Sequence, residues 1–318
     1  MSDAGALFDV YVIADWSAAG APKRGADSIW IAAARRARGA APRLVALLNP
    51  ATRAEAETAL RETLQSALGR GERALLGFDF PFGYPAGAAA RLLGEDAAPA
   101  EDEPLWARLW AKLAREVRDG PRNATNRYAA AGALNAGWAA PGPFWGNGAK
   151  AEIDGLGRRK PSGYGAALPA EFRLVERRLR AAGGPRPKSV WQLAGAGSVG
   201  GQALTGLPVV ERLRRDPRLA TSCRVWPFET GFAPPAAPIA MAEIYPSLIP
   251  VTPAAGEPKD AAQVRTLALA LGALDAKGAL SPLFSAAEDL TAAERAASID
   301  EEGWILGAHH AAALQEAS

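Results

Sequence analysis

The stretch FDVYVIADWSA, residues 8–18, is an apolar run that ends in a polar turn, and it predicts the first strand of a sheet. Two further strands are predicted at 28–36 and 42–50, and the short turn-rich links between them favour an antiparallel meander. Alanine and leucine recur at helical spacing over 51–71, which predicts a helix. The nearly continuous apolar run RALLGFDFPFGYP at 73–85 follows, and such runs are typical of strands that are buried on both faces.

The last third of the chain returns to strands and helices after a long irregular region. Two strands are predicted soon after residue 222, and helices are predicted over 259–278 and 299–317. The irregular region is rich in glycine, proline, asparagine and tryptophan, a composition that is typical of packed binding loops. We therefore predict an α/β core built from 8–86 and 223–318, with a large inserted subdomain at 87–222.

The composition is that of an ordinary globular protein. Of the 318 residues, 49% are apolar and 22% are charged, which excludes a disordered chain, a collagen and a coiled coil. No apolar run reaches the roughly 18 residues of a membrane span, and the N-terminus lacks the basic start of a signal peptide. One cysteine excludes an internal disulfide framework, and two adjacent histidines leave little material for a zinc site or a Ser-His-Asp triad. A cytoplasmic protein without a membrane partner is expected.

The charge is unevenly distributed although the net charge is only +2. Residues 150–224 carry 15 basic and 6 acidic side chains, a net charge of +9, so the remainder of the chain is acidic. A basic segment of this kind can attract a polyanion through its phosphates. The alternative is that these arginines are scattered over solvated helix faces and bind nothing.

Three acidic residues lie in or at the end of apolar strands, namely Asp15, Asp79 and Glu243. A further acidic group, 300–302, opens the last predicted helix. An ionised carboxylate in an apolar strand is costly unless an arginine, backbone donors or a metal ion is its partner. Because the chain has so few histidines, a cluster of these carboxylates suits a hard cation that prefers oxygen ligands, Mg²⁺ or Mn²⁺.

Each of these acids also has a structural interpretation. Asp15 could accept a hydrogen bond from the amide of Ser17 in a turn, and Asp79 could pair with an arginine of the inserted region. Glu243 could be a half-exposed residue of an edge strand. In the last helix, Asp300 suits the N-cap position, and the two glutamates after it suit the positive end of the helix dipole.

Six segments carry a similarity to a known family: VIADWSA, GFDFPFGYP, WQLAGAGSVGGQALTGLP, AEIYPSL, KDAAQVRTLAL and DEEGWILGA. On these segments the chain resembles the DUF429 family, whose members are predicted RNase H-like nucleases. The resemblance touches both ends and part of the middle, and leaves roughly 86–185 uncovered. It implies an RNase H-like three-layer fold with a mixed sheet. In that fold an antiparallel meander precedes a crossover helix, a parallel fourth strand and a last helix that brings an acid to the sheet.

By this resemblance, Asp15 matches the first-strand acid, Asp79 the fourth-strand acid and Glu243 the family's Glu-x-x-Pro position. Glu302, and after it Glu301, falls where the acid of the last helix is expected. The chain departs from the superfamily in having Asp-Trp-Ser where Asp-x-Gly is common, and Glu where the last-helix acid is commonly Asp. The implied activity is two-metal hydrolysis of a phosphodiester, with Asp15, Asp79, Glu243 and Glu302 as catalytic residues. The same four residues and Glu301 would be the metal ligands.

The inserted region would form one wall of the substrate groove. The candidate contacts to phosphate or sugar are polar or glycine residues, most of them in this region: Arg122, Asn123, Asn126, Arg127, Gly195, Gly197, Ser198, Gly200 and Lys259. Trp138, Phe144 and Trp145 could stack on a base, although aromatic residues among glycine and proline more often form a small core of their own. The expected partner is therefore a nucleic acid or a nucleotide-like phosphodiester.

Two other functions compete with phosphodiester hydrolysis. Residues 195–200, GAGSVG, match the fingerprint of a dinucleotide site, which requires a strand before it and a long helix after it. The strand is plausible, but Gly206 and Pro208 predict that the helix breaks early, so a glycine-rich turn that faces the cleft is favoured. The second alternative is a non-nuclease RNase H-like protein that binds a small phosphorylated or nucleotide ligand, for instance in cofactor biosynthesis, because a fold does not determine a function.

Overall fold

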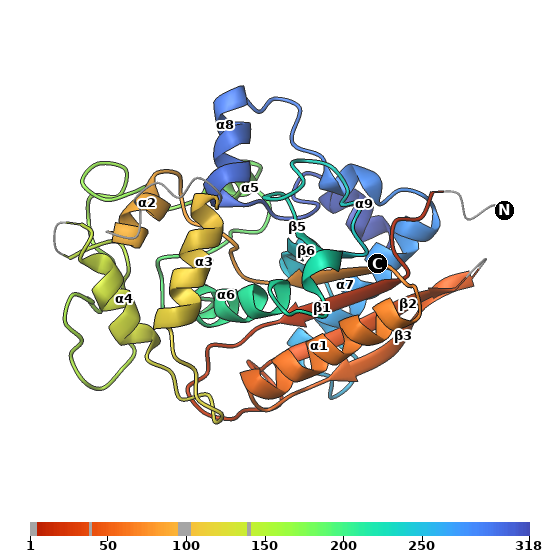
Figure 1. Cartoon of the computed structure of the whole chain (residues 1–318), viewed down its shortest axis with the longest axis horizontal. Helices are drawn as coiled ribbons and strands as arrows, with labels where there is room; N and C mark the ends of the chain where they lie inside the picture. The colour runs from red at the N-terminus through yellow and green to blue at the C-terminus, as the bar shows by residue number, and fades with distance from the viewer. Residues whose placement is uncertain (1–4, 38–39, 95–102, 139–140) are drawn as a thin grey trace.

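The computed structural model describes residues 5–37, 40–94, 103–138 and 141–318. The described residues form a mixed six-stranded sheet in the order β3-β2-β1-β4-β6-β5. The strands are β1 (Val10–Asp15), β2 (Trp30–Ala37), β3 (Ala40–Leu48), β4 (Ala74–Phe78), β5 (Cys223–Val225) and β6 (Ile239–Glu243). Helices cover both faces of the sheet, so the predicted α/β class and mixed sheet are confirmed (Figure 1).

The first three strands form an antiparallel meander, and a helix then crosses to a parallel fourth strand. β1 pairs with β2, and β2 with β3, both in antiparallel fashion. Helix α1 (Arg53–Gly69) begins after Thr52, whose side chain accepts a hydrogen bond from the Glu55 amide. β4 lies parallel to β1, and β6 and β5 continue in the same direction. The carboxyl ends of β1, β4 and β6 therefore meet at one edge of the sheet.

The remaining helices of the described residues belong to two groups, one between β4 and β5 and one after β6. The helices are α2 (Ala88–Leu93), α3 (Leu105–Glu116), α4 (Arg127–Asn135), α5 (Leu174–Ala181), α6 (Gly200–Arg214), α7 (Lys259–Ala276), α8 (Ala292–Ala297) and α9 (Ala311–Glu316). The short helical turns are η2 (Ala220–Ser222), η3 (Pro246–Leu248), η4 (Ser281–Phe284) and η5 (Ser298–Glu302).

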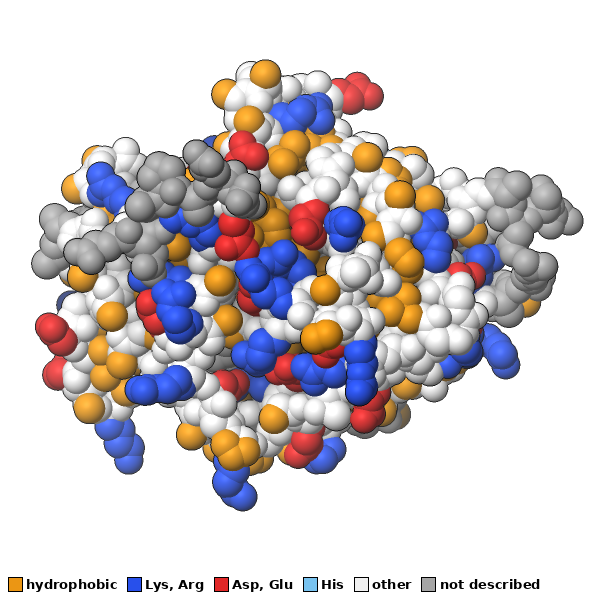
Figure 2. Space-filling model, viewed as in Figure 1, with side chains coloured by type: hydrophobic (Ala, Val, Ile, Leu, Met, Phe, Trp, Pro, Cys, Tyr) orange, Lys and Arg blue, Asp and Glu red, His pale blue; other side chains and the backbone are white. Residues whose placement is uncertain are grey.

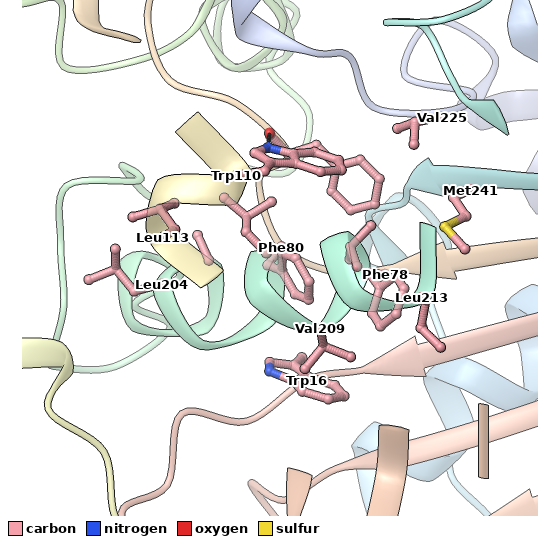
Figure 3. Packing of buried hydrophobic residues seen from close by; sticks show 14 of the residues in the cluster. Trp16, Phe78, Phe80, Trp110, Leu113, Leu204, Val209, Leu213, Val225 and Met241 are labelled. Carbon is pink, nitrogen blue, oxygen red and sulfur yellow. Dashed lines mark hydrogen bonds between the residues drawn. The ribbon is translucent and has the colours of Figure 1, made fainter. Parts of the chain in front are cut away.

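The apolar side chains of the strands alternate between two hydrophobic cores, one on each face of the sheet. Val12 of β1 points into the core that α1 and α6 cover, whereas Tyr11 points into the core that α7 covers. Figure 3 shows the first core, where Trp16, Phe78 and Phe80 lie beside α6. Three layers result, because each face of the sheet must bury its apolar side chains under helices.

The segment 87–222 packs into the same core as the sheet. Leu109 of α3 and Leu207 of α6 belong to the hydrophobic cluster that contains Val12 of β1. The backbone of α6 approaches this cluster closely, because a Cβ at Gly206 would lie 2.3 Å from the Phe80 ring. Helices α3 and α6 of this segment therefore help to cover one face of the sheet.

Two predicted helices differ in the structure. α6 runs unbroken for 15 residues with Pro208 inside it, so the prediction of an early break is wrong. Most of α6 is buried, and this tertiary packing outweighs the roughly 3 kcal/mol that an interior proline costs. The last predicted helix, 299–317, is instead the turn η5 and the short α9, because Gly303 and Gly307 adopt positive φ angles of 70° and 73° between them.

Candidate active site

Asp15 and Asp79, hereafter the aspartate pair, lie side by side at the carboxyl ends of two neighbouring parallel strands. Ala14 of β1 is opposite Phe78 of β4, so the next residue of each strand reaches the same edge of the sheet. The amide of Asp79 donates to the carbonyl oxygen of Ala14 at 3.2 Å, and the amide of Trp16 donates to Oδ1 of Asp79 at 2.7 Å. The two carboxyl groups are in hydrogen-bonding contact with each other.

Burial and this contact change the pKa values of the aspartate pair. Burial raises the pKa of Asp79 to about 6, although the hydrogen bonds from Asp15 and from the Trp16 amide oppose the rise. Burial, followed by the charge of Asp79, raises the pKa of Asp15 well above its usual value. Because two ionised carboxylates in contact repel each other, the raised pKa values belong to the pair and not to one residue alone.

We expect the free energy of unfolding in chelator to fall as the pH rises from about 4 through 6. The folded protein holds protons on the aspartate pair that the unfolded chain releases near pH 4, so their stabilising effect is present at low pH and lost above the raised pKa values. For Asp79 alone the loss is about 2–3 kcal/mol. Urea unfolding at several pH values measures it, and Asp79→Asn should show a smaller fall. Parallel pH curves for the two proteins would contradict the raised pKa of Asp79.

The aspartate pair opens into a cavity of about 650 Å³. Its walls come from the loop after β1, the residue after β4, the start of α4, the glycine loop 193–199, the first turn of α6, the turn after β6 and the first turn of α7. Its volume is within the roughly 300–1,000 Å³ that is usual for small-molecule sites. The core and the segment 87–222 therefore enclose the aspartate pair together.

Sequence reasoning misses a third acid of this cavity, Asp260. It lies in the first turn of α7 and lines the cavity, and its charge raises the pKa of both members of the aspartate pair. Its Oδ2 accepts a hydrogen bond from the amide of Asp27, another residue of the cavity wall, at 2.7 Å. The signal is present in the sequence, because Asp260 directly follows Lys259 in the segment KDAAQVRTLAL at the start of a helix.

The donor set of the cavity suits a hard cation. Asp15, Asp79 and Asp260 offer only carboxylate oxygens, the ligands that Mg²⁺ and Mn²⁺ prefer. A bound cation would displace any proton that Asp15 or Asp79 holds. Within the described ranges, no three His, Cys, Asp or Glu side chains are gathered closely enough to form a metal centre. Asp15 and Asp79 are the residues of this cavity that could hold an ion, and Asp260 lies in the wall of the same cavity.

Glu243 lies outside this cavity, which corrects the prediction that it joins the aspartate pair. In the sheet Glu243 is opposite Phe78, and side chains alternate along a strand, so it points to the other face from the aspartate pair. There it is buried and doubly bonded to Arg173, with Nη1–Oε2 at 2.7 Å and Nη2–Oε1 at 2.5 Å. Glu243 thus joins β6 to the segment that leads into α5.

Glu301 and Glu302 also lie outside the cavity, so neither supplies the predicted last-helix acid there. Glu302 is buried and accepts hydrogen bonds from the amides of Ala86 at 2.8 Å and Leu174 at 2.6 Å. Glu301 accepts hydrogen bonds from two amides at the start of α2. Both glutamates therefore bind backbone, and the acid that a helix brings to the cavity is Asp260.

Four of the predicted substrate contacts line the cavity, namely Arg127, Gly195, Gly197 and Ser198. Gly195 and Gly197 have φ angles of 106° and 69°, which favour glycine in the loop that forms this wall.

The other predicted substrate contacts lie elsewhere. Asn123 and Asn126 use their side chains to bind the backbone of neighbouring loops. Gly200 starts α6 at a point where a Cβ would lie 2.3 Å from a backbone oxygen. Arg122 and Lys259 are exposed and outside the cavity. These five residues are therefore not brought to the aspartate pair.

The aromatic residues of the segment 87–222 pack among themselves. Trp138 and Phe144 are buried, and the centres of their rings lie 6.2 Å and 4.9 Å from that of Trp191. Trp145 is partly buried against the same core. Trp138, Phe144 and Trp145 therefore pack in the hydrophobic core on the α1 and α6 face of the sheet, and they form no separate small core among the described residues.

The glycine motif lacks the surroundings of a dinucleotide site. A dinucleotide site needs a strand before the motif and a long helix after it. Helix α6 supplies the helix, but residues 189–195, which precede the motif, form no strand of the described sheet. The motif instead forms a loop at the wall of the cavity, with helix α6 behind it.

No protein-family model matches this chain, and no curated protein or solved structure matches it either. The resemblance to DUF429 rests on short segments and stays a prediction. Among the described residues, no helix is long and apolar enough to span a membrane. The function must therefore be argued from the cavity and its residues.

Proposed function

We propose that the chain is a Mg²⁺- or Mn²⁺-dependent phosphodiester hydrolase with an RNase H-like core. The observation that carries the proposal is the aspartate pair, two neighbouring carboxyl groups at the ends of adjacent parallel strands in a cavity that Asp260 also lines. The strand order supports it, because a meander, a crossover helix and a parallel strand beside the first strand are what the resemblance to RNase H-like nucleases implies. A nuclease is one form of this activity.

The residues around the aspartate pair hold it in place. The Trp16 amide fixes the orientation of Asp79, and the buried Arg53 holds the loop after β1. Nη1 of Arg53 donates to the carbonyl oxygens of Ser17 at 2.9 Å and Ala19 at 2.8 Å. A divalent cation, when bound, would lower the pKa of a water molecule and neutralise charge on the phosphate. The chain itself supplies the carboxylates and the enclosure.

Asp260→Asn is expected to lower Mn²⁺-dependent hydrolysis of bis(4-nitrophenyl) phosphate by about 100-fold. Asparagine keeps an acceptor for the Asp27 amide but loses the charge in the cavity. Asp300→Asn is the matched control, because Asp300 is exposed and outside the cavity, and its activity should equal that of the wild type. Equal activity of the two variants would remove Asp260 from the site. A wild type that is inactive with both Mg²⁺ and Mn²⁺ would refute the proposed function.

A further inference from the structure

A single cation lines the otherwise acidic cavity. Arg127 is the only arginine or lysine among the described residues of its walls, which also contain four aspartates. The Arg127 guanidinium carbon lies 4.4 Å from the centre of the Tyr128 ring, and Nη2 donates to the Tyr128 hydroxyl at 3.1 Å. Its Nε is buried and has no hydrogen-bond partner among the described residues. Because a buried N–H without an acceptor is costly, Arg127 is suited to an acceptor that a ligand brings.

The wall that carries Arg127 is the positive side of the cavity. Ser198, just before α6, and Gln202, in its first turn, line this wall, and the dipole of this 15-residue helix adds partial positive charge there. The aspartate pair, with its proton or a cation, belongs to the same cavity. A phosphate group can therefore be held between a cation on the aspartate pair and the guanidinium of Arg127, since both attract its oxygens.

None of the 15 basic side chains of the segment 150–224 lines the cavity, and seven of them form ion pairs with carboxylates of the described residues, one of these being Arg214 with Glu211. Arg158 pairs with Glu152, Lys160 with Glu171, Arg173 with Glu243, Arg178 with Asp289, Arg212 with Glu57, and Arg215 with Glu211. On the face in Figure 2, lysine and arginine side chains lie beside aspartate and glutamate and form no continuous stripe. A nucleic-acid groove uses several free cations, because each phosphate along the strand carries a charge.

We infer that the substrate is a compact molecule with one phosphodiester, of nucleotide or dinucleotide size, and not a nucleic-acid polymer. This inference rests on the proposed function and names its substrate class. One cation suits one phosphate group, and the volume of about 650 Å³ suits a small ligand. The rest of the ligand would contact Tyr128, Tyr245 and Gln263, which line the same cavity and are partly buried.

A comparison of substrate lengths tests the inference. The substrates are a dinucleoside monophosphate, which has a single phosphodiester, and single-stranded and duplex DNA and RNA of about 20 nucleotides, with Mn²⁺ present. We expect kcat/KM per phosphodiester to be at least about tenfold higher for the dinucleoside monophosphate, and log KM to change with log salt with a slope of about 1. Polymers that are cleaved tenfold better, with a slope of about 4 or more, would overturn the inference.

Arg127→Met tests the phosphate contact, with Arg186→Met as the control at an exposed position outside the cavity. Loss of a charged hydrogen bond should raise KM for the dinucleoside monophosphate about 10–100-fold, change kcat less, and reduce the salt slope by about 1. The control should leave KM and kcat unchanged. Equal KM values for the two variants would contradict the assignment of Arg127.

Failure of the proposed function is distinguishable from failure of this inference. Bis(4-nitrophenyl) phosphate is a small phosphodiester, so its hydrolysis tests the proposed reaction and not the preference for substrate length. If the wild type with Mn²⁺ does not hydrolyse it, the proposed function is refuted. In that event calorimetric titration with a dinucleoside monophosphate and with a 20-nucleotide DNA, in Ca²⁺, decides the ligand class. Preferential binding of the short compound supports the inference, and preferential or equal binding of the polymer overturns it.

Discussion

Asp79→Asn is expected to abolish metal-dependent hydrolysis and to leave the fold intact. Asparagine keeps the volume of Asp79 and an oxygen that can accept the hydrogen bond from the Trp16 amide. Its amide can donate to Asp15, whose pKa the charge of Asp79 then no longer raises. The loss is electrostatic, since an aspartate pair reduced to one carboxylate binds a divalent cation weakly, and activity should fall by about 10³-fold or more. Hydrolysis of bis(4-nitrophenyl) phosphate in Mn²⁺ measures it, with Asp300→Asn as the control.

Thermal and urea unfolding in chelator separate a metal site from a structural ion pair. At neutral pH the Asp79→Asn protein should be at least as stable as the wild type, because the substitution removes the strain of two adjacent carboxyl groups. If Asp79 instead neutralised a buried arginine, its loss would cost about 3–5 kcal/mol. Added Mn²⁺ should raise the melting temperature of the wild type and have little effect on the variant. A strongly destabilised variant, with no response of the wild type to Mn²⁺, would falsify the metal-site proposal.

The first half of the fold could be predicted because its signals are local. The apolar runs of β1 and β4 and the N-cap Thr52 of α1 each depend on neighbouring residues. Asp15 is predicted at the end of the first apolar strand and Asp79 inside the later one, and the resemblance to RNase H-like folds implies that this later strand is parallel to the sheet's first strand. Their contact follows from strand register, which the order of elements constrains.

The direction of Glu243 could not be predicted, because β6 is buried on both faces. All five of its residues are buried, so the run IAMAE has no apolar–polar alternation to show which face the glutamate takes. Its partner Arg173 is 70 residues away in sequence, in the segment 87–222, and no local pattern connects the two.

The acid on the last helix was assigned to the wrong helix for a related reason. The sequence order put Glu301 and Glu302 on the final helix, but the turn that holds them ends at Gly303. The helix that lies along β1, β2 and β3 is α7, whose contacts with all three strands are long-range. Asp260 could have been found from the start of α7, where an acid stabilises the helix dipole and also reaches the carboxyl edge of the sheet.

Arg173→Met is expected to destabilise the protein by about 3–5 kcal/mol, the range for breaking a buried ion pair. Arg173 is fully buried and binds Glu243 twice, at 2.7 Å and 2.5 Å, and Glu176 at 3.0 Å. Its Nη1 also donates to the carbonyl oxygen of Glu302 at 2.8 Å. Without the guanidinium, two buried carboxylates lose their counter-charge. Urea unfolding at neutral pH measures the loss, and Arg178→Met is the control, since Arg178 forms a surface pair with Asp289 whose removal should cost at most about 1 kcal/mol.

The pH dependence and a second substitution identify the cause of this loss. Burial raises the pKa of Glu176, and the charge of Arg173 opposes that rise. In the Arg173→Met protein this carboxyl is therefore neutral at low pH, and the cost of its buried charge appears as the pH rises. The difference from the wild type should therefore be smaller at about pH 4.5 than at about pH 7.5. Adding Glu243→Gln to Arg173→Met should recover part of the stability, because it removes the unpaired charge. A loss that equals that of Arg178→Met, or that is independent of pH, would mean that Arg173 acts through packing and not through its charge.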